Sequence, residues 1–382
     1  MAARRPASTR SAASAAPPAE SGAPRVIPAC QHFGSCGGCV AQHLPDPAYA
    51  AWKAAQVEAA LRRAGFPAVP AAPLARTPPG TRRRMDLALR RVGATVAVGL
   101  HRARSEEVID LLECPVLHPA LFALFAPLRG LLPGFGGLRR EGSAIANLLD
   151  SGPDLVLRTD AALTPRDRMG LTGFARENRL ARVSWMGRDG VAEPIAILRP
   201  PTMTFGGVGV TVPPGAFLQA SKEGEAAIVA AVLAGLPESL PGRARIADLY
   251  AGCGTLTFAV ARRARVSAFE GDEAAVTALI AAARHAQDVR VEVRKRDLAR
   301  QPLGPAELAA FAAVVLDPPH AGAVAQVQAI AAARVPLVIY VSCNPAALAR
   351  DARVLAAAGY RADCVTVVDQ FLWSARVESV AV

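Results

Sequence analysis

A cysteine at the end of a predicted buried strand is the first candidate for chemistry in this sequence. Residues 337–341 (LVIYV) form a short apolar run rich in β-forming side chains, and residues 342–345 (SCNP) then turn the chain into a helix. Proteins with α/β folds place reactive groups at the carboxyl ends of such strands, and a helix N-terminus favours a thiolate over a thiol. Cys343 is therefore a candidate nucleophile. The alternative is that it fills a buried position as a small hydrophobic side chain.

A glycine-containing loop follows another predicted strand, at residues 246–250. Its sequence AGCGT places Gly252 and Gly254 before a helix, and Thr257 stands where a dinucleotide-binding loop has a third glycine. Such a loop does not provide for close approach of a pyrophosphate. S-adenosylmethionine has no phosphate and needs only two glycines, so we expect this cofactor here, with another nucleotide as the alternative.

Two carboxylates follow the next strands in positions that suit the same ligand. Glu270 ends the second strand and can bind ribose hydroxyls, as an acidic residue there does in dinucleotide enzymes. Asp297 follows the third strand and is placed to reach the adenine side. Gln219, in a loop before a helix at 222–236, is a further polar candidate for holding a ligand.

The motif that starts at Asp317, after the fourth strand, indicates methylation of a nucleobase. Similar Asp-Pro-Pro motifs serve amino methylation, where an aromatic fourth residue stacks on the flipped base. Here the fourth residue is His320, and the next strand offers Cys343 instead. That exchange moves the expected chemistry from a nitrogen atom to a carbon atom.

Four cysteines form a candidate metal site near the N-terminus. Cys30, Cys36 and Cys39 have the spacing C-x5-C-x2-C, and Cys114, which precedes a proline, is the natural fourth ligand. Four thiolates suit either an iron–sulfur cluster or Zn²⁺, and ligation by a nearby histidine would favour zinc. The spacing alone leaves these two alternatives open, together with a redox pair or no metal.

Composition points to a polyanionic partner and a reducing compartment. The net charge is +11, and all but three of the 43 basic residues are arginine, which favours nucleic acid, although genome composition is an alternative explanation. No apolar run is long enough to span a bilayer, and no signal peptide is evident. The seven cysteines are odd in number and clustered, which argues against a set of disulfides and for a reducing compartment. We therefore expect a cytoplasmic protein whose cysteines bind metal or act in catalysis.

The chain divides into four predicted regions. Residues 1–28 read as a disordered basic tail, and residues 29–115 as a metal-binding region with an amphipathic helix and a hairpin. Residues 116–215 read as a central α+β region that binds RNA. Residues 216–382 alternate strands and helices, which predicts a doubly wound, Rossmann-like domain at the C-terminus.

Elements outside the C-terminal region are predicted less regularly. A helix is expected at 48–64, and a hairpin at 85–91 and 96–101 that turns at Gly93. The central region is expected to contain a helix at 119–132 and strands at 154–158, 182–186, 195–198 and 203–212.

With these residues identified, the chain resembles the RNA (uracil-5-)-methyltransferases, which make 5-methyluridine in bacterial 23S rRNA and tRNA. The motifs FLQAS, DLYAGCGTLT, DPPHAG, YVSCNPAALARD and RVESVAV occur in the family's order, between Cys30 and Val382. The closest resemblance is to the iron–sulfur type without a TRAM domain. It implies a class I methyltransferase domain, S-adenosylmethionine as cofactor, and a 4Fe–4S cluster on Cys30, Cys36, Cys39 and Cys114.

The resemblance also assigns roles to individual residues. Cys343 would be the nucleophile that adds to C6 of uracil, and Glu378 the base that removes the proton from C5. The glycine loop and neighbouring polar residues would contact the cofactor. These residues are Gln219, Tyr250, Gly252, Gly254, Thr255, Glu270, Asp297 and Asp317.

Departures from the family pattern leave the exact RNA target open. His320 stands where arginine is common, and Thr255 where asparagine is usual. Arg376 and Leu372 replace a frequent histidine and proline. We expect a monomer acting on 23S rRNA, with tRNA as an alternative target. Cytosine-C5 methylation and a non-catalytic, cluster-bearing RNA-binding protein with a relic cofactor site are the competing functions.

Overall fold

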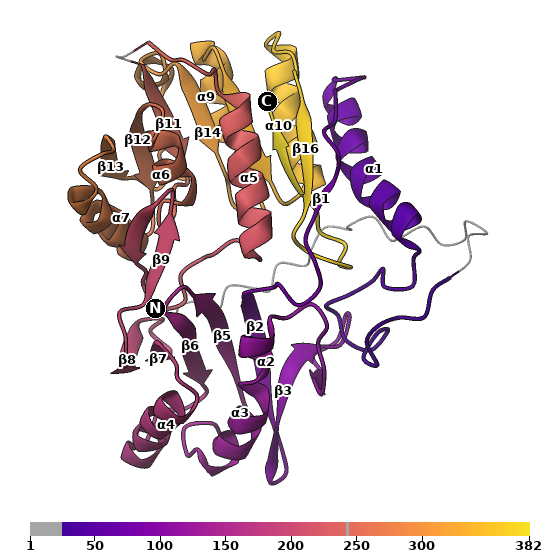
Figure 1. The fold of residues 1–382 in the computed structure, drawn as a ribbon, viewed down its shortest axis with the longest axis vertical. Helices are drawn as coiled ribbons and strands as arrows, with labels where there is room; N and C mark the ends of the chain where they lie inside the picture. The colour runs from indigo at the N-terminus through magenta and orange to yellow at the C-terminus, as the bar shows by residue number, and fades with distance from the viewer. Residues whose placement is uncertain (1–24, 242–243) are drawn as a thin grey trace.

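The computed structural model describes residues 25–241 and 244–382, which form two large sheets with helices around them, one above the other in Figure 1, and a separate two-stranded sheet. Most of the predicted tail lies outside these residues. Within the described ranges, every helix is too short or too polar to cross a bilayer.

The upper sheet has eight strands and a parallel centre. Strands β15, β14, β11, β12 and β13 run parallel, and β17 is inserted antiparallel between β15 and β16. Its strands in spatial order are β1 (Ala75–Arg76), β16 (Val365–Asp369), β17 (Glu378–Ala381), β15 (Val338–Ser342), β14 (Ala313–Leu316), β11 (Arg245–Leu249), β12 (Arg265–Glu270) and β13 (Val291–Lys295). The predicted doubly wound fold is confirmed.

Helices cover both faces of this sheet because its central strands are apolar on both sides. One face packs against α5 (Lys222–Gly235), α6 (Thr255–Ala261) and α7 (Glu273–His285). The other packs against α1 (Asp46–Ala64), α8 (Pro305–Leu308), α9 (Val324–Ala333) and α10 (Pro345–Ala357).

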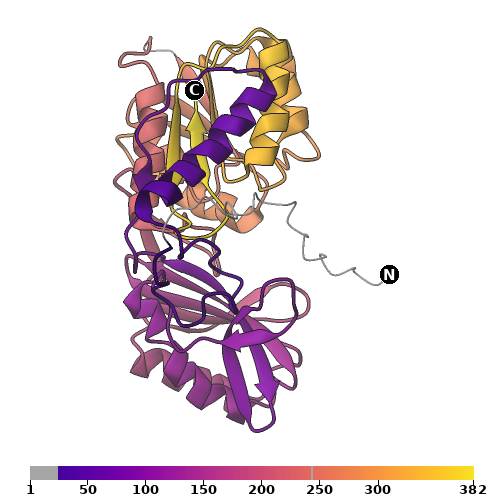
Figure 2. The same cartoon turned by 90° about the vertical axis from the view of Figure 1, so that its right-hand side faces the viewer.

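Helix α1 belongs to the upper layer although it lies far away in sequence. It begins after Pro45 and ends at Gly65, whose φ of 109° is a left-handed cap. Its apolar face, with Val57 and Leu61, packs into the same core as α10, and Figure 2 shows the two helices side by side. The predicted 29–115 region is therefore shared between the two sheets, because the buried face of α1 matches the C-terminal core.

The lower sheet has seven strands and holds the predicted hairpin. All of its strand pairs are antiparallel except β6 and β7, which are joined through α4 (Pro165–Glu177). In spatial order the strands are β4 (Val108–Asp110), β3 (Thr95–His101), β2 (Arg84–Val92), β5 (Glu141–Leu149), β6 (Gly152–Thr159), β7 (Arg182–Met186) and β8 (Ala192–Ile197).

Three predictions for the central region were wrong or incomplete. The expected strand 203–212 is a hairpin, β9 (Thr202–Phe205) and β10 (Val208–Thr211), because Gly206 and Gly207 between them both take positive φ. The expected helix 119–132 is broken into α2 (Pro119–Phe122) and α3 (Phe125–Leu131), followed by a 3₁₀ turn, η1 (Leu132–Gly134). Pro127 has no N–H to bond the carbonyl of Ala123. Strand β5 and helix α4 were not predicted.

Candidate active site

Six predicted site residues lie in one row along an edge of the upper sheet. Five stand at or just after the carboxyl ends of adjacent parallel strands, and the sixth begins β17, which runs the opposite way. The row therefore follows the spatial order of the strands and brings distant parts of the sequence together. From β17 to β13 it comprises Glu378, Cys343, Asp317, Tyr250, Glu270 and Asp297.

Strand register sets Cys343 opposite Glu378. Strands β15 and β17 pair with Ser342 opposite Ser379, so the next position of each strand faces the other. Glu378 is only 3% exposed. Its Oε2 accepts a hydrogen bond from Nε2 of Gln370 at 2.8 Å, and its Oε1 has no hydrogen-bond partner among the described residues. A buried carboxyl oxygen without a partner is suited to receive a proton or a ligand.

Gln370 links both sides of the site and was missed in the sequence. Its Oε1 accepts from the N–H of Ala220 at 2.8 Å, so its Nε2 is the donor to Glu378 and to Oε1 of Gln219, at 2.7 Å. Gln219 must then present its own nitrogen, which donates to Asp317 Oδ2 at 3.0 Å. The N–H of Ala220 thus fixes the orientation of the Gln370 amide, which in turn fixes that of Gln219. The two amides link the carboxyl group of Glu378 to that of Asp317.

Helix α1 holds the segment that carries Gln370. Lys53 Nζ lies 2.8 Å from Oδ1 of Asp369, with both side chains fully buried. The hydroxyl of Tyr49 donates to Asp369 Oδ2 at 2.5 Å and accepts from the N–H of Trp373 at 2.7 Å. Removing one partner of such a buried ion pair leaves the other charge unpaired, so this contact strongly fixes the start of the β16–β17 loop.

Electrostatics around Cys343 oppose ionisation of the free thiol. Burial raises its pKa to about 12, and the nearby carboxylates Glu378 and Asp317 add to the effect, while Arg376 lowers it. The expectation that the helix N-terminus would favour the thiolate is therefore outweighed by burial and by these two carboxylates. Burial likewise raises the pKa values of Glu378 and Asp317 above the usual carboxyl range.

The glycine loop and Glu270 form one hydrogen-bonded unit. Tyr250, Gly252 and Gly254 all take positive φ, which folds the loop tightly between β11 and α6. The N–H of Gly252 donates to Glu270 Oε2 at 2.8 Å, and Thr255 begins α6. The loop and the carboxylate are thus held together at the carboxyl ends of β11 and β12.

The buried carboxylate of Asp248, near this loop, was not predicted. Asp248 is 1% exposed within β11 and accepts a hydrogen bond from the hydroxyl of Thr257. Burial raises its pKa to about 7. A single acidic residue inside the apolar run IADLY was the available sequence signal.

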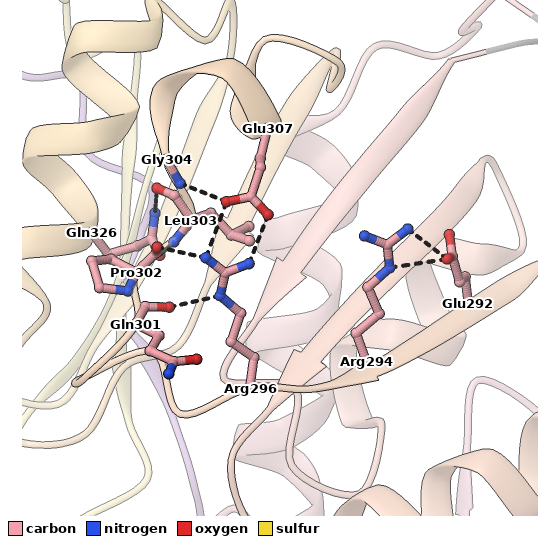
Figure 3. Close-up of polar contacts among 9 residues, drawn as sticks. All are labelled: Glu292, Arg294, Arg296, Gln301, Pro302, Leu303, Gly304, Glu307 and Gln326. Carbon is pink, nitrogen blue, oxygen red and sulfur yellow. Dashed lines mark hydrogen bonds and ion pairs between the residues drawn. The ribbon is translucent and has the colours of Figure 1, made fainter.

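The loop after β13 that carries Asp297 is tied down by the arginine before it. Figure 3 shows Arg296 between Glu307 and the loop backbone. Its Nη1 lies 2.6 Å from Glu307 Oε1, and its Nε donates to the carbonyl of Gln301 at 2.7 Å. Gln326 of α9 accepts from the N–H of Leu303 at 2.8 Å. These contacts fix the loop at the end of the row, where Asp297 is exposed.

The four predicted metal ligands lie on two loops that hydrogen bond to each other. The N–H of Cys36 donates to the carbonyl of His32 at 2.8 Å, and the N–H of Leu112 donates to His32 Nε2 at 3.0 Å. Burial raises the pKa of Cys39 to about 12, with smaller contributions from the other three thiols, Cys114, Cys36 and Cys30. The four cysteines are thus within electrostatic range of one another.

These thiols do not form a closed metal site as they stand. Across the described ranges, no three His, Cys, Asp or Glu side chains are arranged so that they could hold a metal ion. Thiolates are nevertheless the type of ligand that iron–sulfur and zinc sites use. The same loop also touches the active-site segment, because the N–H groups of Val40 and Ala41 both donate to the carbonyl of Trp373.

Comparison with known proteins identifies relatives over nearly the whole chain. It is 43% identical over 364 residues to an uncharacterized RNA methyltransferase of Brucella suis, covering 94% of this chain and 84% of the relative. It is 33% identical to the 23S rRNA (uracil(1939)-C(5))-methyltransferase RlmD of Pectobacterium atrosepticum, covering 94% and 80%. Residues 236–335 also match the family described as "Conserved hypothetical protein 95".

A solved structure shares the fold. The Pyrococcus abyssi tRNA (uracil-54, C5)-methyltransferase, determined in complex with S-adenosyl-L-homocysteine, has a TM-score of 0.67 and 20% sequence identity. The similarity covers 90% of this chain and 85% of that one. It supports the α/β methyltransferase fold with its mixed sheets.

Proposed function

Because this chain belongs to the RNA (uracil-5-)-methyltransferases, which are S-adenosylmethionine-dependent enzymes, we propose that it methylates C5 of a uridine in 23S rRNA through a covalent adduct with Cys343. The observation that carries this proposal is the register of β15 and β17, which sets Cys343 opposite the buried Glu378. A thiol and a carboxyl group side by side are the two groups that carbon methylation of uracil requires.

The proposed reaction uses these two groups in succession. C5 of uracil is a poor nucleophile until a thiolate adds to C6 and makes the ring an enolate, which then takes the methyl group. Glu378 then removes the proton from C5, and the electrons of that bond restore the ring double bond and expel the Cys343 thiolate. Since burial raises its pKa, Glu378 is a stronger base once ionised than an exposed carboxylate.

The methyl donor would bind along the rest of the row. Gly252, Gly254 and Thr255 would form the floor of its site, with Tyr250 beside it. Glu270 and Asp297 would bind the ribose and the adenine side, while Gln219 and Asp317 would lie between the donor and Cys343. Bound there, S-adenosylmethionine supplies an electrophilic methyl group. The hydrogen bond from Gly252 to Glu270 supports this arrangement, because it fixes the carboxylate beside the loop.

RNA is the partner that this surface suits. The net charge of +11 favours a polyanion. Phe217, in the loop before Gln219, is 68% exposed, and the guanidinium of Arg84 lies 5.6 Å from its ring centroid. An exposed aromatic ring beside an arginine is a stacking surface for an unpaired base. We propose that the lower sheet, including the predicted region 116–215, completes the RNA-binding face.

The substrate proposal favours 23S rRNA over tRNA. The relative that acts on 23S rRNA is 33% identical over most of both chains, whereas the tRNA enzyme shares the fold at 20% identity. An enzyme with this substrate would act in the cytoplasm, and we propose that it does so as a monomer.

The test of the function is transfer of labelled methyl groups from S-adenosylmethionine to unmodified total RNA, followed by nucleoside analysis and site mapping. We expect labelled 5-methyluridine in 23S rRNA. Label in tRNA would support the alternative target, and label in 5-methylcytidine would contradict uracil chemistry. Cofactor binding without label in any RNA would favour a non-catalytic RNA-binding protein.

We also propose that Cys30, Cys36, Cys39 and Cys114 hold a 4Fe–4S cluster. Four thiols within range of one another support this assignment, and the resemblance favours iron over zinc. The methyl transfer needs no electrons, so the cluster would be structural. It would hold the loop whose N–H groups bond Trp373, next to the active-site segment.

Replacing Cys114 with serine is expected to remove the cluster. Protein purified without oxygen should contain about four iron atoms per chain and absorb broadly in the visible range, and the Cys114→Ser variant should lose most of both. Metal analysis and absorption spectra measure this. Cys364→Ser, which alters a cysteine outside the set, should behave as wild type. Active wild-type protein with zinc or with no metal would disprove the assignment.

Replacing Gln370 with methionine is expected to lower turnover by roughly tenfold to a hundredfold. The change removes a hydrogen bond that stabilises ionised Glu378, and such bonds contribute about 1.5–3 kcal/mol. Loss of this bond raises the pKa of Glu378, so the rising limb of the pH–rate profile should move to higher pH.

Turnover measured between about pH 6 and pH 9 tests this expectation. Gln326→Met is the matched control, since Gln326 is equally buried but bonds only the backbone of Leu303. An unchanged pH–rate profile in Gln370→Met would show that the amide does not tune Glu378.

A further inference from the structure

The imidazole of His320 lies against the proposed nucleophile. Its Nδ1 is 3.7 Å from Sγ of Cys343, within hydrogen-bonding range for sulfur. The backbone of the same residue is held separately, because Nδ2 of Asn344 donates to the carbonyl of His320 at 2.8 Å. The turn after β14 is thus fixed to the start of α10, and the ring is free to serve the thiol.

Burial and the neighbouring charges together keep the thiol and the imidazole neutral in the free protein. Burial and the carboxylates Glu378 and Asp317 raise the pKa of Cys343 to about 12. Burial, with Arg376 nearby, lowers the pKa of His320 below its usual value. A neutral imidazole can accept a proton, whereas the thiol must lose one before it can attack.

We propose that His320 is a catalytic residue that accepts the thiol proton of Cys343 as its sulfur adds to the base. The pairing of a cysteine with a histidine is a general way to activate a thiol. The role of His320 rests on the proposed function in one respect only: that function identifies the atom attacked by Cys343 as C6 of a uracil.

The proton and electron balance of the step is complete within the site. The S–H proton moves to Nδ1 of His320, and the sulfur electron pair forms the bond to C6 while the C5–C6 π electrons move towards the C4 carbonyl. After Glu378 has removed the C5 proton, the C6–S bond breaks towards sulfur. The thiolate then recovers its proton from the imidazolium, so His320 and Cys343 end as they began.

This role sets the chain apart from the family pattern in which arginine is common at the position. A guanidinium remains protonated and offers no acceptor nitrogen, so it can only stabilise a thiolate by its charge. An imidazole can take the proton itself.

The test compares the rate of Cys343 alkylation by iodoacetamide in wild-type protein and His320→Gln, followed by peptide mass spectrometry across the pH range. In the wild type, neutral His320 can take the thiol proton, so Cys343 should still be alkylated at a measurable rate when the pH is lowered to near 7. In His320→Gln only the thiolate reacts, so the rate should rise about tenfold per pH unit and fall at least tenfold below wild type at pH 7. His285→Gln, on the exposed end of α7, is the matched control.

Methyl-transfer kinetics give a second readout. The kcat of His320→Gln should fall at least tenfold at pH 7 with the KM for RNA unchanged, and the deficit should shrink as pH rises, because hydroxide then ionises the thiol. Damage to the fold would not be relieved in this way. His320→Arg, which supplies charge without an acceptor, should also lack the component of the alkylation rate that persists to neutral pH.

The outcomes separate this inference from the function. Identical alkylation profiles for wild type and His320→Gln would overturn the role of His320, whatever RNA is methylated. A changed profile in a protein that methylates no RNA would leave the Cys–His pair established and overturn the proposed substrate instead.

Discussion

Replacing Cys343 with alanine is expected to reduce methyl transfer to RNA by at least about 10³-fold, while S-adenosylmethionine still binds. Without the thiol, no adduct forms at C6, and C5 of the uracil ring stays too weak a nucleophile. The side chain follows β15 in a segment held by the Asn344 cap and by pairing of β15 with β17, so its removal should leave the fold intact.

The measurement is incorporation of labelled methyl groups, with calorimetric titration of the cofactor in parallel. Cys364→Ala provides the control, since Cys364 precedes β16 at the opposite edge of the sheet. Residual turnover above a few per cent of wild type would exclude Cys343 as the nucleophile.

Replacing Glu378 with glutamine is expected to trap the enzyme on its RNA. The amide is nearly isosteric and can still accept the hydrogen bond from Gln370, so addition of Cys343 and methylation of C5 should proceed. It cannot remove the C5 proton, and the bond between Cys343 and the base then has no path to break. Turnover should fall by roughly 10² to 10⁴ as the adduct accumulates.

Denaturing gel electrophoresis detects the trapped species as a protein band shifted by covalently bound RNA. The double variant Cys343→Ala with Glu378→Gln is the control and should give no shifted band. Wild-type turnover in Glu378→Gln would remove Glu378 from the mechanism, and a shifted band in the double variant would place the adduct on another residue.

The sequence by itself predicted the elements whose pattern is local. The alternation of apolar strands with helices from residue 245 onward predicted the doubly wound sheet, because its central strands β11, β14 and β15 are buried on both faces and are apolar along most of their length. The row of predicted site residues also followed from sequence, since parallel strands present their carboxyl ends at one edge. The resemblance added Glu378, which no local pattern distinguishes from an ordinary acidic residue near the C-terminus.

Elements with weak or ambiguous periodicity could not be placed in this way. Strand β5 contains small residues and one asparagine that is buried against the loop at Ala216, so its sequence does not alternate clearly. The pair of glycines at 206–207 lies within a predicted strand, although both adopt the positive φ of a turn. The amphipathic pattern of α1 predicted a helix but not its partner, because one apolar face can pack on any apolar surface.

Only the tertiary structure decided which polar groups meet. Register between β15 and β17 set Glu378 opposite Cys343, and packing of α1 against Asp369 holds the segment in which Gln370 bonds both Glu378 and Gln219. The approach of His320 to Cys343 likewise depends on two loops joined through Asn344. The sequence determined which reactive groups the chain carries and on which strands. Their protonation depends on burial and on neighbours distant in sequence, so the fold alone determined how those groups can act.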